Sequence, residues 1–229
     1  MNPGPPELEE RFRRFLDGRG GDVAPLFYFL RGDGHARAGT EAWAALILSR
    51  IHLLRGAVHL ASACLRLASS RSGGGPEALR LGILVNYALV RRARGEQAAS
   101  ADILRAVVDR ALRSRELPAA AKAASNGALS LARLGRTDEA CSYAGLAERL
   151  YGSGRDAEGL ARVSLIRAVI DMKRGRGEEA IDRLARSLGE CAGKELERER
   201  LIALLLLGEA YIGRREHDRA EQVLAGAAA

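Results

Sequence analysis

The sequence predicts an all-α protein built from about five helix–turn–helix repeats. Its 229 residues are 47% hydrophobic, 28% charged and only 4% aromatic, and beyond the N-terminal segment the chain is rich in Ala, Leu, Arg and Glu, which favour helix. A break in the helical pattern recurs with a small residue five positions later, and the last four copies step by 40 residues. The pairs are Gly56 with Ala61, Gly95 with Ser100, Gly135 with Ala140, Gly175 with Ala180, and Arg215 with Ala220. Repetition at such a period indicates a solenoid.

The two recurring positions have separate physical roles in such an array. A lone helix pair cannot bury its apolar stripe, so neighbouring pairs stack and share a core. The glycine is expected to close the first helix of each pair in a left-handed turn. The small residue is expected to let the second helix approach the first closely, because a bulky side chain there would overpack the contact.

Residues 1–39 fall outside the repeat pattern and are predicted to form a tail and a capping segment. Residues 1–6 are a Pro/Gly tail, residues 7–16 fit a short amphipathic helix, and residues 23–31 fit either a helix or a strand. Phe27, Tyr28 and Phe29 lie in that last segment. They either pack on the first repeat as a cap or form an exposed interface for a partner or a second copy.

Residues 40–229 are predicted to be the repeat array. Its first helix is expected to follow Thr40 as N-cap and to span 14 residues, 41–54, and its second spans residues 57–69. A Ser/Gly-rich linker follows at residues 70–75, and Pro76 restarts a helix in its first turn, where a missing N–H has no consequence.

The net charge of +7 is uneven along the chain. Residues 1–115 carry 18 basic and 11 acidic side chains, whereas residues 116–229 carry 18 of each. Only Lys122, Lys173 and Lys194 are lysines, and all other basic residues are arginines. A GC-rich genome also produces such an arginine bias. A basic half fits an acidic protein or a nucleic acid as partner.

The sequence contains no catalytic, metal-binding or cofactor-binding motif. Cys64, Cys141 and Cys191 are far apart, which favours a reducing compartment over a disulfide framework or a metal site. His52 and His59 lack zinc-site spacing, and no phosphate-binding glycine loop occurs. The chain also shows no signal peptide and no run long enough to span a bilayer. We expect a non-enzymatic, cytoplasmic, bacterial protein without a cofactor.

Three copies carry a closer pattern, at residues 125–150, 167–188 and 204–227. The last copy places these residues on recognisable positions: Leu207, Gly208, Tyr211, Ala220, Leu224 and Ala227. This pattern resembles the tetratricopeptide repeat (TPR) family over about 80% of the chain. The period of 40 exceeds the family's 34, the aromatic residue early in the first helix is mostly missing, and the closing proline is absent. Repeats of this longer type are similar to helical sensor arrays of bacterial regulators.

The resemblance implies a right-handed superhelix in which the first helix of each pair lines a concave groove. Such a groove would hold an extended peptide or a partner's helix. By register, Asn86 and Asn126 coincide with the groove asparagine that clamps a ligand backbone in this family. The cations expected beside them are Arg92, Lys122, Arg133, Arg162 and Lys173. Asparagine is a poor choice inside a helix without a hydrogen-bonding role, which supports the two asparagines.

Three functions remain open from the sequence. The first is a non-catalytic adaptor or regulatory module that binds a partner protein or peptide, which would be acidic if the groove is basic. The second is a self-assembling subunit that joins copies through the aromatic N-terminal segment and a C-terminal repeat without a polar cap. The third is nucleic-acid binding through the basic half, against which the shortage of aromatic stacking platforms argues.

Overall fold

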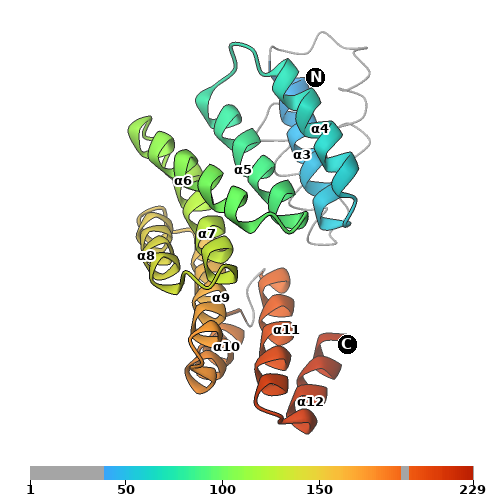
Figure 1. The fold of residues 1–229 in the computed structure, drawn as a ribbon, viewed down its shortest axis with the longest axis vertical. Helices are drawn as coiled ribbons and strands as arrows, with labels where there is room; N and C mark the ends of the chain where they lie inside the picture. Colours follow the sequence, from blue (N-terminus) through green and yellow to red (C-terminus); the bar gives the residue numbers. More distant parts are fainter. Residues whose placement is uncertain (1–38, 192–195, 229) are drawn as a thin grey trace. The chain divides into compact units, whose positions relative to one another are not determined.

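The computed structural model describes residues 39–191 and 196–228. Within these residues the chain forms ten α-helices and no strand (Figure 1). The helices are α3 (Thr40–Leu54), α4 (Val58–Arg71), α5 (Glu77–Ala93), α6 (Gln97–Arg113), α7 (Leu117–Arg133), α8 (Thr137–Ser153), α9 (Ala157–Lys173), α10 (Gly177–Cys191), α11 (Glu197–Gly213) and α12 (His217–Ala228). The all-α prediction of about five helix pairs is confirmed. The helix and the apolar segment predicted for residues 7–16 and 23–31 lie outside the described residues, so the boundary after residue 39 stays a prediction.

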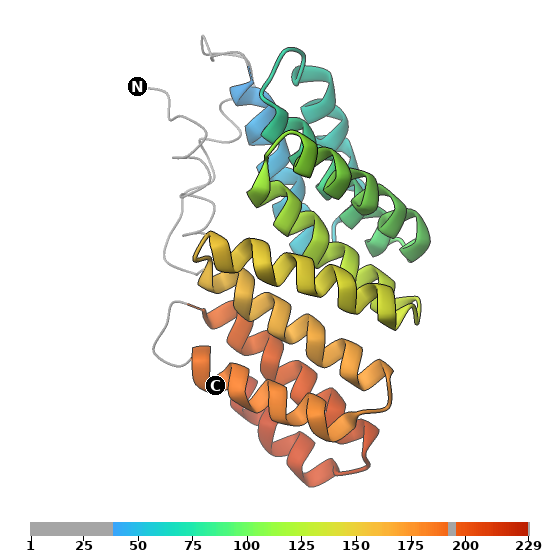
Figure 2. The ribbon, with the colours of Figure 1, turned by 90° about the vertical axis from the view of Figure 1, so that its left-hand side faces the viewer.

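The chain divides into two compact units, Met1–Ala119 and Ala120–Ala229. In the described part of the first unit, α3 packs on α4 and α5, and α5 packs on α6. In the second unit, α9 packs on α8, α10 and α11, and α11 packs on α12. Figure 2 shows α9 to α12 lying side by side. The second unit also holds nearly all of α7.

The same tight turn joins seven successive helix pairs of the described residues, all except α4 to α5 and the connection before α11. One residue in each turn takes a positive φ, between 53° and 84°. These residues are Gly56, Gly95, Arg115, Gly135, Arg155, Gly175 and Arg215. The next N–H then donates to the carbonyl five residues back, as from Asp156 to Tyr151 at 3.0 Å, which satisfies a carbonyl at the helix end.

The turn spacing shows a regularity finer than the predicted period. From Gly95 to Gly175 a left-handed residue occurs every 20 residues, and α5 to α9 each contain 17 residues. The sequence predicted only the turns within pairs. The turns between pairs have Arg115 and Arg155 at the left-handed position, where a glycine would have indicated a turn. A residue other than glycine in this conformation costs about 1–2 kcal/mol.

This difference between turns predicts opposite effects of two substitutions. Gly135→Ala should lower the free energy of unfolding by about 1 kcal/mol, because a Cβ is strained at this positive φ. Arg155→Gly should raise it, because the same strain is removed. Urea unfolding followed by circular dichroism measures both effects, and Gly152→Ala, in an open helical position, is the control. Equal effects at the two turns would contradict a conformational cause.

The small residues predicted at the helix contacts are buried as expected. Ala61, Ser100, Ala140 and Ala180 have no exposed surface, and Ala220 is 3% exposed. Close approach recurs in the last pair, where a Cβ on Gly208 would lie 2.8 Å from the Leu224 side chain. One local detail was wrong: Gly39 is the N-cap of α3, and Thr40 is its buried first residue without a capping bond.

Candidate functional site

Helices α7 and α9 carry basic side chains at equivalent positions of consecutive repeats. Lys122 and Arg162 are 40 residues apart, and so are Arg133 and Lys173. Within each helix the two cations are 11 residues apart, close to three full turns, so they share one helix face. Lys122, Arg133 and Lys173 are exposed, whereas the side chain of Arg162 is 21% exposed. The second unit therefore presents these four cations on the first helices of its pairs.

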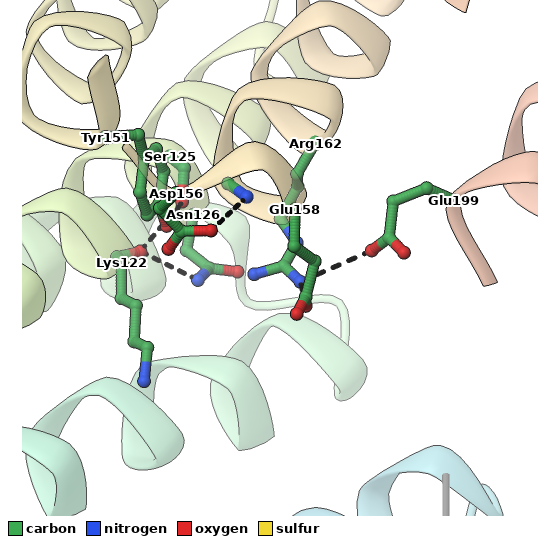
Figure 3. Close-up of polar contacts among 9 residues, drawn as sticks. Lys122, Ser125, Asn126, Tyr151, Asp156, Glu158, Arg162 and Glu199 are labelled. Carbon is green, nitrogen blue, oxygen red and sulfur yellow. Dashed lines mark hydrogen bonds and ion pairs between the residues drawn. The ribbon is translucent and has the colours of Figure 1, made fainter. Parts of the chain in front are cut away.

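Asn126 lies one turn beyond Lys122 on the same face of α7. Its Nδ2 donates to the carbonyl of Lys122 at 2.8 Å, and the residue is half-buried. Figure 3 shows the amide of Asn126 and the guanidinium of Arg162 on the same side of their helices. The hydrogen bond orients the amide, and an oriented amide can pair with a peptide backbone, which offers both donors and acceptors.

Tyr151, at the end of α8, supports both helices of this surface. Its hydroxyl lies 3.3 Å from Oγ of Ser125, the residue before Asn126 on α7. Its ring lies over Gly159 of α9, where a Cβ would come within 2.2 Å of the ring. Asp156 caps the same turn of α9, its Oδ1 accepting the N–H of Gly159 at 2.8 Å. The sequence did not predict this arrangement, because its only signal is a glycine, Gly159, in the first turn of a helix.

Arg162 is neutralised by two carboxylates (Figure 3). It pairs with Glu158 one turn earlier on α9, and its Nη2 lies 3.4 Å from Glu199 on α11. Glu199 is 3% exposed. Burial acts to lower the pKa of Arg162, but the charges of Glu158, Tyr151 and Glu199 outweigh it and raise that pKa. Arg162 thus joins α9 to α11, and the exposed basic character rests on Lys122, Arg133 and Lys173.

Asn86 lies in a different environment from Asn126, although the two are 40 residues apart. Asn86 is 4% exposed, and its Nδ2 lies 3.3 Å from the carbonyl of Leu46 and 3.2 Å from Oγ of Ser49. Both partners are on α3, so the amide ties α5 to α3. The expectation of a ligand-facing Asn86 does not fit this burial. The hydrogen-bonding role inferred from an asparagine inside a helix is present, but it is structural.

The two asparagines should therefore respond differently to truncation. Asn86→Ala should lower the free energy of unfolding by about 1–2 kcal/mol, because a buried side-chain hydrogen bond is lost. Asn126→Ala should change it by less than about 0.5 kcal/mol, as is usual at partly exposed sites. Urea titration of both variants provides the comparison. Equal losses would show that register, rather than environment, sets their roles.

The remaining predicted site residues do not extend this surface. Arg92 is half-buried near the end of α5, at the position equivalent to Ala132, and the position equivalent to Arg133 is Ala93. Phe27, Tyr28 and Phe29 lie outside the described residues, so their role as an interface stays a prediction.

Several arginines in the basic N-terminal half of the chain form ion pairs with acidic side chains. Arg110 and Arg80 both bond to Glu77, with Arg110 Nε at 2.5 Å and Arg80 Nε at 2.9 Å. These hydrogen bonds, the Arg110 bond first, lower the pKa of the Glu77 carboxyl. Arg91 pairs with Glu96 and lies over the ring of Tyr87. Paired guanidinium groups are less available to phosphates, which weakens the nucleic-acid alternative.

A cavity of about 240 Å³ lies among α8, α9 and α10, on another face of α9 than Arg162. Its lining consists of Glu148, Leu160, Ser164, Arg167, Arg183, Arg186 and Glu190. Arg167 donates to Glu148 at 2.6 Å, and Arg183 donates to the buried Asp171 at 3.0 Å. Because its arginines are largely matched by acids, this cavity has no clear preference for an anion.

The described residues show no arrangement that suggests chemistry. They contain no group of three or more His, Cys, Asp or Glu side chains placed to hold a metal ion. Burial raises the pKa of the Cys64 thiol, which keeps it protonated and poorly nucleophilic. Within the same residues, no helix combines the length and the apolar character that crossing a bilayer requires.

Comparison with known proteins gives matches among solved structures. No protein-family model matches the chain, and no curated protein matches it. A Rap protein complexed with competence and sporulation factor matches with a TM-score of 0.78 and 12% identity over 96% of this chain. NprR in complex with its cognate peptide NprX matches with a TM-score of 0.67 and 14% identity over 97% of it. This chain covers 62% of the Rap chain and 65% of the NprR chain.

A third match decides the type of repeat. The nearly identical TPR-like repeats of a Podosopora anserina kinesin light chain match with a TM-score of 0.59 and 18% identity, over 84% of this chain and 95% of that chain. The chain has a TPR-like fold. The TPR-like repeats here reach 40 residues because each consists of two 17-residue helices and two three-residue turns, as from α5 to α9. At these identities the likeness concerns the fold.

Proposed function

We propose that the chain is a non-catalytic interaction module that binds a peptide or a partner's segment on the face of α7 and α9. The supporting observation is the set of recurring polar residues on that face. Asn126 is fixed one turn from Lys122, Arg133 lies three turns beyond Lys122 on α7, and Lys173 lies three turns beyond Arg162 on α9. The structural match to a protein bound to its cognate peptide agrees with this role.

The chemistry of the surface defines the ligand it would favour. The amide of Asn126 suits an extended backbone, and exposed Lys122, Arg133 and Lys173 suit acidic side chains. Because Glu158 and Glu199 pair with Arg162, we expect an acidic ligand to meet the cations at the two ends of this face rather than Arg162. We therefore infer an extended peptide with acidic residues, bound more weakly as salt rises.

The test uses peptides selected by the full chain from a random phage-displayed library. Each selected peptide is titrated by calorimetry against the native chain and the variant Lys122→Ala with Asn126→Ala. We expect the variant to bind at least about tenfold more weakly, because one hydrogen bond and one charged contact are lost. The matched control, Arg149→Ala with Gln222→Ala, removes one exposed cation and one exposed amide from α8 and α12.

Two outcomes would refute the proposal. One is a selected peptide that binds the variant and the native chain with the same affinity, because its site would then lie elsewhere. The other is a library that yields no binder for the native chain. Circular dichroism confirms that the variant is folded, as expected for a half-buried and an exposed position.

A further inference from the structure

Helix α11 is the first helix of the last described pair. It exposes apolar side chains at positions where the equivalent helix, α9, buries them. Leu165 of α9 is 4% exposed, whereas Leu205, 40 residues later, is 56% exposed. Ala161 is 7% exposed and its equivalent Leu201 is 36% exposed. The third position pairs Met172, which packs against a buried core, with Ile212, which is 51% exposed. Leu201, Leu205 and Ile212 lie within about 40° around α11 and form one stripe, here called the α11 stripe.

The next repeat covers the equivalent positions of α9. Leu165 and Ala168 belong to a buried cluster with Ala203 and Leu207 of α11, and Met172 packs against it. In the described residues α11 itself packs on α9, α10 and α12. The α11 stripe is thus in register with an interface that the array already uses.

Helix α12 differs from α10 at a position beside the equivalent interface. At the α9–α11 interface the second helix α10 contributes Ile181 to the apolar cluster. The equivalent residue of α12 is Glu221, which is exposed. An occupant that buried this carboxylate would have to supply a cation for it, whereas one that contacts α11 and leaves α12 at the edge keeps Glu221 in water.

We propose that the α11 stripe binds α11 of a second copy in a two-fold symmetric dimer. An antiparallel crossing near Leu205 places apolar stripe against apolar stripe and leaves Glu221 of each copy outside. Arg198 and Glu209 flank the stripe on one side of α11, about three turns apart. The crossing brings Arg198 of one copy near Glu209 of the other, so the flanking charges are complementary.

The α11 stripe is separate from the face proposed for peptide binding, which lies on α7 and α9. By register, the equivalent of that face on α11 lies about 80° from the stripe around the helix axis. Dimer formation and peptide binding therefore succeed or fail independently. Three apolar side chains per copy make a small contact, well below the size of standard interfaces. We expect a reversible dimer that forms at high protein concentration.

Sedimentation equilibrium over a concentration series tests the dimer. The native chain should shift from the monomer mass of 24.5 kDa towards twice that value as concentration rises. Leu205→Glu and Ile212→Glu should each weaken association at least about tenfold, because each would bury a carboxylate. The matched control is Leu60→Glu on α4, which is 43% exposed and should leave association unchanged.

A cross-link tests the two-fold geometry. Leu205→Cys should form a disulfide-linked dimer under mild oxidation, because Leu205 lies near the symmetry axis, whereas Leu60→Cys and the native chain should not. A native chain that stays monomeric at all concentrations overturns the proposal. So does growth beyond a dimer, or a Leu205→Glu chain that is folded by circular dichroism and associates as the native chain does.

Discussion

Leucine in place of Ala140 should lower the free energy of unfolding by roughly 3 kcal/mol, at the upper end of the usual range for overpacking. Ala140 has no exposed surface and lies in the first turn of α8. Three extra heavy atoms cannot point to solvent from that position, so they must displace α8 or force strained rotamers. Urea unfolding followed by circular dichroism measures the loss.

The matched control is Ala185→Leu, an exposed position of α10. It adds the same atoms to a helix of the same unit, and we expect a change within about 0.5 kcal/mol. If Ala140→Leu proved equally mild, the helices would be free to move apart and the spacing of the repeat would not depend on this residue. Ala180, fully buried at the equivalent position of the next repeat, should behave as Ala140 does.

The sequence predicted the array because its most regular signals are local. A left-handed turn favours glycine and a close helix contact favours alanine, so Gly135 and Ala140 recur with the repeat. Arg115 and Arg155 hid the turns between pairs, since those turns have the same geometry without the marker residue. A backbone conformation leaves a trace in the sequence only where the chain uses the residue that suits it best.

The candidate site was harder to predict because it depends on contacts between repeats. Asn86 and Asn126 have the same register, but α3 offers Asn86 a carbonyl and a hydroxyl to bond. Arg162 has the same register as Lys122, yet Glu199, 37 residues further along, neutralises it. Register fixes the face on which a side chain lies, and the neighbouring helices fix its partners.

Removal of Arg162 should lower the free energy of unfolding by about 3 kcal/mol, because truncating one member of a buried ion pair leaves the other charge without a partner. The carboxylate at risk is Glu199, whose side chain is 4% exposed. Arg162 retains some exposure, so we expect the lower end of the range seen for such pairs. Urea unfolding of Arg162→Ala gives the value. Glu158→Ala is the control, because the side chain of Glu158 is 44% exposed and its pairing within α9 contributes about 0.5 kcal/mol or less.

The double variant Arg162→Met with Glu199→Gln separates the structural role of Arg162 from a role in binding. It removes both charges, so most of the lost stability should return, and a double-mutant cycle gives the coupling between the two side chains. A selected peptide should bind this variant as it binds the native chain if Arg162 serves only to join α9 to α11. Weaker binding in the restabilised variant would show that the guanidinium also contacts the ligand. A coupling near zero would mean that the stability of the folded chain does not depend on the pairing of Glu199 with Arg162.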